Sequence, residues 1–405
     1  MFEHVEAYAG DPILSLMDDF RQDPRKAKVN LSIGFYYDHN GDIPVLDSVI
    51  AAKALLDQQP VEPNLYLPMS GEPQYCQAVQ QHIFGEQPTA VTDRLITIQS
   101  VGGSGALRVG ADFLKRYYPD AKVYVSHPTW DNHQAIFAGA GFEVLGYPYL
   151  NQDQTDIDFS AMLKTFAHLS EHSIVLLHAC CHNPTGLDLE PSQWDQLFAL
   201  FKEKQIIPFL DSAYLGLGDG LEQDAYAIRA LAQSGLTGFV SNSFSKVFSL
   251  YGERVGSLSV ICESAAIAEK VSGQLKATIR ANYSNPPRFG AQLVRIILEN
   301  EALYQQWLQE VENMLKRLLQ VRSDLYQAIH KIAPDLDVGY LLKQKGMFSF
   351  TGLTAVQVDE IREKYGVYLI RNGRICIAGL NSGNIQIVAQ AIAEVATQQL
   401  VEAAI

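Results

Sequence analysis

Two side chains at the ends of predicted strands have the types and surroundings that amine chemistry needs. Lys246 follows the run 240–245, which is made of apolar and small polar residues. Lysine is rarely buried unless it is paired or chemically used, and desolvation frees the lone pair of an amine to attack a carbonyl. A lysine whose amine extends to the surface is the competing interpretation. Asp211 ends a second run, 206–210, and places a carboxylate at a comparable position.

An anion site is indicated by Gly102-Gly-Ser-Gly105, which lies between a predicted strand and a predicted helix. Backbone N–H groups and the helix dipole at such a turn favour phosphate. The pattern is neither GxGxxG nor a Walker loop, so it is weak evidence by itself. Arg254, eight residues after Lys246, adds a cation that can share the same phosphate. A lysine, a carboxylate and a phosphate seat are the contacts that pyridoxal 5′-phosphate requires, and the carboxylate keeps its ring nitrogen protonated.

Two histidine-containing motifs resemble metal sites. His168-Leu-Ser-Glu-His172 matches the HxxEH pattern of zinc enzymes, but no later segment offers a third ligand. His178-Ala-Cys-Cys-His182 carries soft ligands, but it is predicted as a strand, in which alternate side chains point to opposite faces. We therefore expect no metal, and we interpret both motifs as core or solvated side chains.

These candidate residues require an α/β framework to bring them together. Short apolar or β-branched runs predict strands over 94–99, 122–126, 142–147, 173–177, 206–210 and 238–242, with helices over 106–117 and 194–204. Such a pattern indicates a mostly parallel sheet covered on both faces, with its ligand crevice beyond the carboxyl ends of the strands. After about residue 300, a helix over 301–332, a second helix and short strands near Val367 and Arg374 predict a smaller α+β domain. We expect the N-terminal segment to join it.

The composition predicts an ordered, soluble chain. Its 405 residues are 47% hydrophobic and 19% charged, which excludes disordered and fibrous proteins. The net charge of −14 disfavours binding to nucleic acids and to anionic membranes. No apolar run approaches the ~18 residues of a membrane span, and the acidic residues near Met1 are unlike a signal peptide. Five scattered cysteines without a CxxC motif indicate reduced thiols, so we expect a cytoplasmic enzyme.

Five motifs resemble the class I aminotransferases, the family of the aspartate and aromatic enzymes. They are His182-Asn-Pro-Thr-Gly186, Asp211-Ser-Ala-Tyr214, Ser243-Phe-Ser-Lys246, Tyr251-Gly-Glu-Arg-Val-Gly256 and Arg280-Ala-Asn-Tyr-Ser-Asn-Pro-Pro287. The likeness extends from the motif at 7–14 to the one at 377–381, and the segments 102–115 and 136–144 are most similar to bacterial tyrosine (aromatic) aminotransferases. One departure is Ser212, where family members often carry a larger apolar residue, and we expect it to leave the chemistry unaffected.

The resemblance implies the pyridoxal-phosphate transferase fold type I, with a mostly parallel mixed sheet between helices in the large domain and a smaller α+β domain. It implies that Lys246 binds the cofactor pyridoxal 5′-phosphate covalently and shuttles a proton between the substrate α-carbon and the C4′ carbon of the cofactor. It further implies that Asp211 pairs with the ring nitrogen, while Tyr214 hydrogen-bonds the phenolic oxygen. The other cofactor contacts it implies are Gly103, Ser104, Trp130, His133, Asn183, Ser243, Arg254 and, from a partner chain, Tyr66. The substrate contacts it implies are Gly34, Tyr66, Trp130, Asn183, Arg280 and Arg374. By spacing alone, Trp130 is a core aromatic and His133 a helix-surface histidine.

The function implied by the resemblance is a ping-pong transfer of the amino group from tyrosine or phenylalanine, and also from aspartate, to 2-oxoglutarate in amino acid biosynthesis. A homodimer is implied because Tyr66 and Arg280 act across a twofold axis. One alternative is an aspartate aminotransferase with little aromatic activity. A lyase or decarboxylase of the same fold is disfavoured by Arg280 with Arg374, and a non-catalytic binding module by Lys246. We expect an N-terminal arm with part of the small domain over 1–45, a large cofactor-binding domain over 46–312 and a small C-terminal domain over 313–405.

Overall fold

The computed structural model describes residues 1–6, 12–60 and 63–402, and divides the chain into two compact units. One unit comprises residues 44–316, and the other joins residues 1–43 to residues 317–405. Residues 7–11 of the motif at 7–14 lie outside the described residues. No helix among the described residues is long and apolar enough to cross a bilayer.

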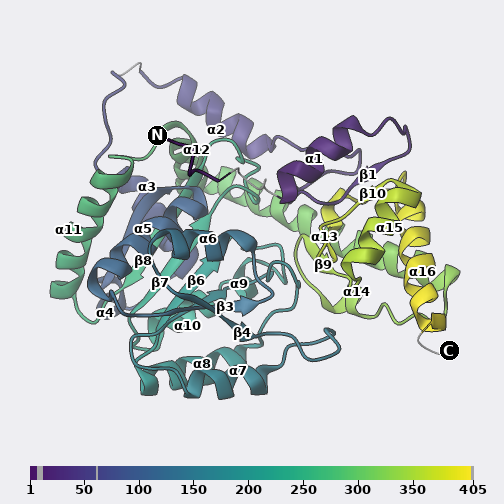
Figure 1. The fold of residues 1–405 in the computed structure, drawn as a ribbon. Helices are drawn as coiled ribbons and strands as arrows, with labels where there is room; N and C mark the ends of the chain where they lie inside the picture. Colours follow the sequence, from purple (N-terminus) through teal and green to yellow (C-terminus); the bar gives the residue numbers. More distant parts are fainter. Residues whose placement is uncertain (7–11, 61–62, 403–405) are drawn as a thin grey trace. The chain divides into compact units, whose positions relative to one another are not determined.

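The unit of residues 44–316 is built on a seven-stranded sheet in the order β2-β8-β7-β6-β5-β3-β4 (Figure 1). Its strands are β2 (Leu95–Val101), β3 (Val123–His127), β4 (Val144–Pro148), β5 (Ile174–His178), β6 (Ile207–Ser212), β7 (Gly238–Ser243) and β8 (Val255–Ile261). All neighbouring pairs are parallel except those of β8, which runs antiparallel to both β2 and β7. The predicted mostly parallel sheet is therefore confirmed, with boundaries shifted by one or two residues.

Helices cover both faces of this sheet, which is why its central strands carry almost no exposed residue. One face packs against α5 (Gly102–Tyr117), α6 (Asp131–Gly139) and α11 (Ala265–Asn282) in a single apolar cluster. The remaining helices of the unit are α2 (Asp47–Asp57), α3 (Pro73–Phe84), α4 (Thr89–Thr92), α7 (Phe159–Ala167), α8 (Pro191–Lys204), α9 (Leu221–Asp224), α10 (Tyr226–Gln233) and α12 (Phe289–Glu299). The sheet is thus a buried platform whose strand ends can hold polar groups away from water.

Two features of this unit differ from the sequence-based expectation. Helix α5 begins at Gly102, whereas the pattern predicts a loop up to Gly105, so the glycine-rich segment is the first turn of the helix. Packing of α5 on the sheet outweighs the low helix propensity of glycine. Strand β8 was not predicted, because its sequence VGSLSVI alternates small and polar residues with apolar ones although all seven residues are buried.

The second unit contains short strands and longer helices. Strand β1 (Val29–Asn30) pairs parallel with β10 (Val367–Tyr368), and β9 (Phe348–Phe350) pairs antiparallel with β11 (Arg374–Cys376). The helical segments are α1 (Pro12–Gln22), the part of α13 (Glu301–Ile332) after residue 316, α14 (Tyr340–Lys343), α15 (Ala355–Tyr365), η1 (Ile377–Gly379) and α16 (Ile385–Glu402). The predicted long helix and the short strands near Val367 and Arg374 are therefore confirmed.

Close contact between α5 and β6 generates a stability prediction. A Cβ atom added at Gly110 would lie 2.7 Å from the Phe209 ring, so Gly110→Ala has to push α5 away from the sheet. We expect the free energy of unfolding to fall by about 1–3 kcal/mol. Urea titration followed by circular dichroism measures this loss.

The matched control is Gly273→Ala in α11, where an added Cβ atom meets nothing within 4 Å. Alanine is the better helix former, so this variant should be unchanged or more stable by up to about 1 kcal/mol. Equal unfolding midpoints for the two variants would contradict the close packing of α5 on β6.

Candidate active site

The carboxylate of Asp211 lies at the carboxyl end of β6 and is hydrogen-bonded from two neighbouring elements. His133 on α6 donates its Nε2–H to Oδ2 over 2.9 Å, and Ser241 on β7 donates its hydroxyl to Oδ1 over 3.1 Å. Asp211 and Ser241 are register partners in the β6–β7 pair. The second ring nitrogen of His133, Nδ1, lies 2.9 Å from the Thr129 hydroxyl. Because both ring nitrogens are occupied, the orientation of the imidazole is fixed.

This environment keeps Asp211 ionised although its side chain is buried. Burial acts to raise the pKa of Asp211, but the hydrogen bond and charge of His133, with the Ser241 hydrogen bond, lower it overall. The neighbouring His178, at the end of β5, is neutral because burial and the charge of His133 lower its pKa to about 3. A buried anion at a strand end can hold a proton on a basic nitrogen of a ligand above it.

The first turn of α5 faces the end of β7 and a guanidinium. A Cβ atom added at Gly102 would lie 2.5 Å from Nη2 of Arg254, and one added at Gly103 would lie 3.1 Å from Cβ of Ser243. Arg254 also donates through Nη1 to the hydroxyl of Ser245 over 3.3 Å. The first N–H groups of a helix have no partner within the helix, so this cluster combines backbone donors with a cation. Together these groups form an anion seat that a side chain at either glycine would obstruct.

Lys246 follows β7 and is half-buried, with its Nζ 5.0 Å from the centroid of the Tyr214 ring. The segment after it is fixed by Trp307 on α13, whose indole N–H donates to the carbonyl of Val247 over 2.9 Å. The same indole stacks on Phe248 at 4.6 Å between ring centroids. Sequence reasoning missed Trp307, because its role depends on a helix about sixty residues further along the chain.

Three other predicted residues belong to the unit of residues 44–316. Ser104 lies in the first turn of α5, Trp130 directly precedes α6, and Asn183 is buried in the turn after β5. The Trp130 ring packs edge-on against His133, with 5.2 Å between centroids. His133 itself is fully buried, so its interpretation as a helix-surface histidine is wrong. The bond from Ser241 to Asp211 was also missed, although register between strand ends could have revealed it.

Gly34 and Arg374 lie together in the other unit. Arg374, on β11, stands over the ring of Phe348 with 4.3 Å to the centroid and donates to the Ser32 carbonyl over 2.7 Å. A Cβ atom added at Gly34 would lie 2.7 Å from Cζ of the same Phe348 ring. Glycine at position 34 therefore allows the ring to sit under the guanidinium, which orients Arg374.

Tyr66 and Arg280 are not brought together with Asp211 by the described contacts. The Tyr66 side chain is 92% exposed, and Arg280 projects from the last turn of α11, where it donates to the hydroxyl of Ser284. Both residues belong to exposed surface of this chain.

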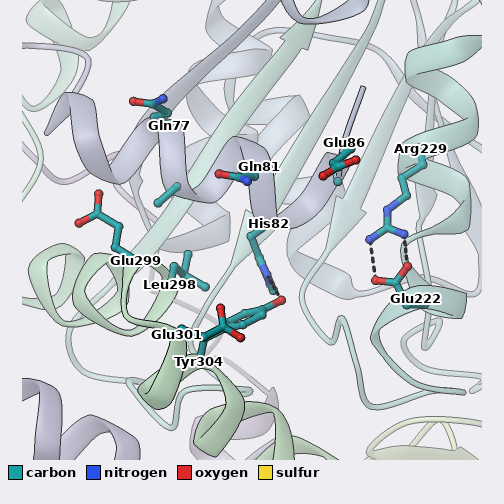
Figure 2. A pocket seen from close by; sticks show the side chains of 12 residues that line it. Gln77, Gln81, His82, Glu86, Glu222, Arg229, Leu298, Glu299, Glu301 and Tyr304 are labelled. Carbon is teal, nitrogen blue, oxygen red and sulfur yellow. Dashed lines mark hydrogen bonds and ion pairs between the residues drawn. The ribbon is translucent and has the colours of Figure 1, made fainter. Parts of the chain in front are cut away.

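A separate cavity of about 580 Å³ contains none of the predicted site residues (Figure 2). Its charges include an ion pair between Glu222 and Arg229, and the hydroxyl of Tyr304 faces Nδ1 of His82 at 3.5 Å. Burial, followed by the charge of Arg229, lowers the pKa of His82 to about 4, so this imidazole is neutral. We therefore place the candidate site at the strand ends around Asp211 and Lys246.

Comparison with known proteins identifies the family. The family model "Aminotransferase class I and II" matches residues 26–392. The aromatic-amino-acid aminotransferase of Escherichia coli is 56% identical over 98% of this chain and 100% of its own, and the aspartate aminotransferase of Pseudomonas aeruginosa is 45% identical over 98% and 99%.

A solved aromatic-amino-acid aminotransferase from Burkholderia pseudomallei, covalently bound to pyridoxal phosphate, is structurally similar. It is 44% identical, with a TM-score of 0.94 over 98% of this chain and 99% of its own. The resemblance drawn from the motifs is confirmed, and this chain belongs to the class I and II aminotransferases.

Proposed function

We propose that this protein is an aromatic-amino-acid aminotransferase that moves the amino group of tyrosine or phenylalanine, and also of aspartate, to 2-oxoglutarate. The observation that carries the chemistry is the buried, ionised Asp211, held by His133 and Ser241 at a strand end of the unit that also presents Lys246. The aromatic preference is supported by the 56% identity to the Escherichia coli enzyme of that name.

The donor set of the candidate site fits pyridoxal 5′-phosphate. An ionised carboxylate matches its basic ring nitrogen, and the anion seat at Gly102 and Gly103 with Arg254 matches its phosphate. When bound, this cofactor accepts the amino group and withdraws electrons from the substrate α-carbon. Lys246 supplies the amine that bonds to it.

Each residue of the chain then has a distinct task. Asp211 holds a proton on the ring nitrogen, and His133 with Ser241 keeps that carboxylate ionised and oriented. Lys246 would take the proton from the substrate α-carbon and pass it to the C4′ carbon of the cofactor. Tyr214 and Asn183 donate hydrogen bonds to the phenolic oxygen of the cofactor, and Trp130 stacks on its ring.

The phosphate and the substrate are held by further groups. Gly103, Ser104, Ser243 and Arg254 bind the phosphate, together with Tyr66 from a second copy of the chain. Arg374, with Gly34 beside it, binds the substrate α-carboxylate through a bidentate, charge-assisted pair. Arg280 of the second copy faces the distal carboxylate of a dicarboxylic substrate. The exposure of Tyr66 and Arg280 in the single chain supports their role across a dimer.

The assembly and the cellular setting are part of the proposal. We propose a homodimer with shared active sites in the cytoplasm, working in amino acid biosynthesis. Residues 46–312 form the cofactor-binding domain, while 1–45 and 313–405 form the arm and the small domain. The compact units of residues 44–316 and of 1–43 with 317–405 support this division.

A second candidate is an aspartate aminotransferase with little aromatic activity, supported by the 45% identity to the Pseudomonas aeruginosa enzyme. The two functions are separated by kcat/KM for tyrosine, phenylalanine, tryptophan and aspartate, each with 2-oxoglutarate. A value for aspartate that exceeds all three aromatic values by several orders of magnitude would favour the second candidate.

The covalent role of Lys246 is tested by reduction. We expect the purified protein to be yellow, and borohydride followed by peptide mapping to place the cofactor on Lys246. Lys246→Ala should abolish turnover but still bind the cofactor non-covalently, whereas Lys270→Ala, at an exposed position of α11, should behave as wild type. A label on any other lysine rules out the assignment.

The role of Asp211 is tested with two substitutions. Asp211→Ala should lower kcat about a hundredfold or more, because a buried charge-assisted hydrogen bond is worth up to about 3 kcal/mol. Ser241→Ala removes one hydrogen bond and keeps the anion, so we expect less than about a tenfold loss. The rate of α-proton abstraction is measured by stopped-flow spectroscopy in both variants. A near-normal rate in Asp211→Ala would mean that another group supplies the charge.

The dual specificity is tested at Arg280. Loss of a partly desolvated ion pair costs about 3 kcal/mol, so Arg280→Leu should lower kcat/KM for aspartate and glutamate roughly a hundredfold. Aromatic donors gain only apolar burial near this residue and should stay within about tenfold. If phenylalanine and tyrosine fall as steeply as the dicarboxylates, Arg280 is structural.

A further inference from the structure

The turn after β5 places two adjacent thiols beside a carboxylate. The sulfur atoms of Cys180 and Cys181 and one carboxylate oxygen of Asp224 all lie within 4.8 Å of one another. Both cysteines are free thiols, and neither has a task in the proposed transamination. The prediction that the motif 178–182 lies on a strand is wrong after its first residue, because β5 ends at His178. The two cysteines therefore form a preassembled dithiol.

The backbone around the dithiol is held by a second carboxylate. Asp188 accepts the N–H of Cys181 over 2.7 Å and the N–H of His182 over 2.8 Å. Cys181 adopts a left-handed conformation with φ of 50°, which turns the chain directly after Cys180. Two consecutive thiols can therefore meet in this turn, whereas consecutive side chains of a strand point apart.

His182, which directly follows the dithiol, does not take part in it. His182 has both ring nitrogens occupied, with Nε2 at 2.8 Å from the Ser126 hydroxyl and Nδ1 at 2.8 Å from the Thr185 hydroxyl. Asp224 is also fixed, because its carboxylate accepts the backbone N–H groups of Gly216, Gly218 and Asp219 over 2.8–2.9 Å. The reactive part of the cluster is thus the pair of sulfur atoms.

Both thiols are protonated at neutral pH. The hydrogen bond with Cys181 acts to lower the pKa of Cys180, but burial and nearby carboxylates raise it overall to about 12. The hydrogen bond with Cys180, followed by burial, raises the pKa of Cys181 well above its usual range. Zn²⁺ requires deprotonated thiolates and usually a fourth ligand, so this site is poorly suited to it.

We propose that Cys180 and Cys181 form a chelating site for trivalent arsenic, a thiophilic element that reacts with thiols to give an uncharged product. Arsenous acid, As(OH)₃, forms two As–S bonds here while two As–OH bonds break, and each released hydroxide leaves as water with one thiol proton. The oxidation states of arsenic and sulfur do not change. An uncharged product suits a site that is closed to water.

Chelation is the reason that the pair differs from a single cysteine. Once one sulfur has bonded, the second is held beside the arsenic atom, and such intramolecular attachment raises overall affinity by about 10²–10⁴-fold. The other three cysteines, Cys76, Cys262 and Cys376, are well separated from one another in sequence and belong to no such group among the described residues.

Occupation of the dithiol should also affect turnover. The Cys181 thiol lies 3.8 Å from the carbonyl oxygen of Tyr214, and Asn183 follows two residues later in the same turn. When the sulfur atoms bond to arsenic they have to move, and this movement would shift Tyr214 and Asn183, the two residues that are proposed to bind the phenolic oxygen of the cofactor. This consequence for turnover rests on the proposed function, whereas the binding of arsenic does not.

The test uses the full-length protein with sodium arsenite. After long incubation and desalting, intact mass spectrometry should show one arsenic per chain, with loss of two of the five titratable thiols. Cys180→Ser and Cys181→Ser should each bind arsenite about a hundredfold more weakly, whereas Cys76→Ser, a half-buried single cysteine, should bind as wild type. A small dithiol should remove the arsenic, and a monothiol at equal thiol concentration should not.

A measurement on the wild-type chain covers the case in which a serine variant fails to fold. Alkylation under denaturing conditions after arsenite treatment should spare Cys180 and Cys181 and modify the other three cysteines. The site is ruled out if wild type binds no arsenic while folded, or if either serine variant keeps wild-type affinity. If one arsenic binds but the absorbance of the pyridoxal-phosphate-bound enzyme and its kcat stay unchanged, the predicted effect on turnover is wrong. Retention of arsenic by a protein that fails the Lys246 reduction test would count against the proposed function alone.

Discussion

A buried negative charge at the end of β6 is the constraint on which the active-site architecture depends. Asp211 can remain ionised away from water only because His133 and Ser241 supply hydrogen bonds from α6 and β7. Those donors require in turn that α6 packs on the face of the sheet and that β6 and β7 stay in register. The apolar cluster beneath them excludes water and so makes the pairing matter energetically.

The anion seat depends on a second constraint, the close approach of the α5 backbone to neighbouring side chains. Glycines at positions 102 and 103 let the first turn of α5 lie against Arg254 and Ser243, where a side chain at 102 would collide with the guanidinium and one at 103 would be tightly packed. A negative group at Asp211 on β6 and a positive group at Arg254, directly before β8, thus sit at the same end of the sheet on the two sides of β7 and give the site a defined polarity. A ligand with a basic ring and an anionic arm is oriented by that polarity alone.

The sequence predicted most of the framework, and it placed Asp211 and Lys246 at the ends of predicted strands; the structure has them at the end of β6 and after β7. The ends of β6 and β7 were predicted within two residues from short apolar runs, because parallel strands buried on both faces have a strong compositional signal. Strand β8 was not predicted, because its small and polar residues are not typical of a fully buried strand. Trp307 was not predicted, because its contact with Val247 depends on long-range packing. The Cys180–Cys181 pair was not predicted, because it depends on the left-handed conformation of Cys181. Tyr66 and Arg280 lie on exposed surface of this chain, so their roles stay predictions.

The position of β8 between β2 and β7 has a consequence for how the protein is made. Val101, which immediately precedes the first turn of α5, pairs with Val255, more than 150 residues later. Closing so long a loop carries an entropic cost that local contacts cannot offset early in folding. During synthesis on the ribosome, β2 therefore has no strand to pair with until β8, residues 255–261, has emerged. Pairing of β8 also brings Arg254 to the glycines of α5, so the anion seat cannot form before that pairing.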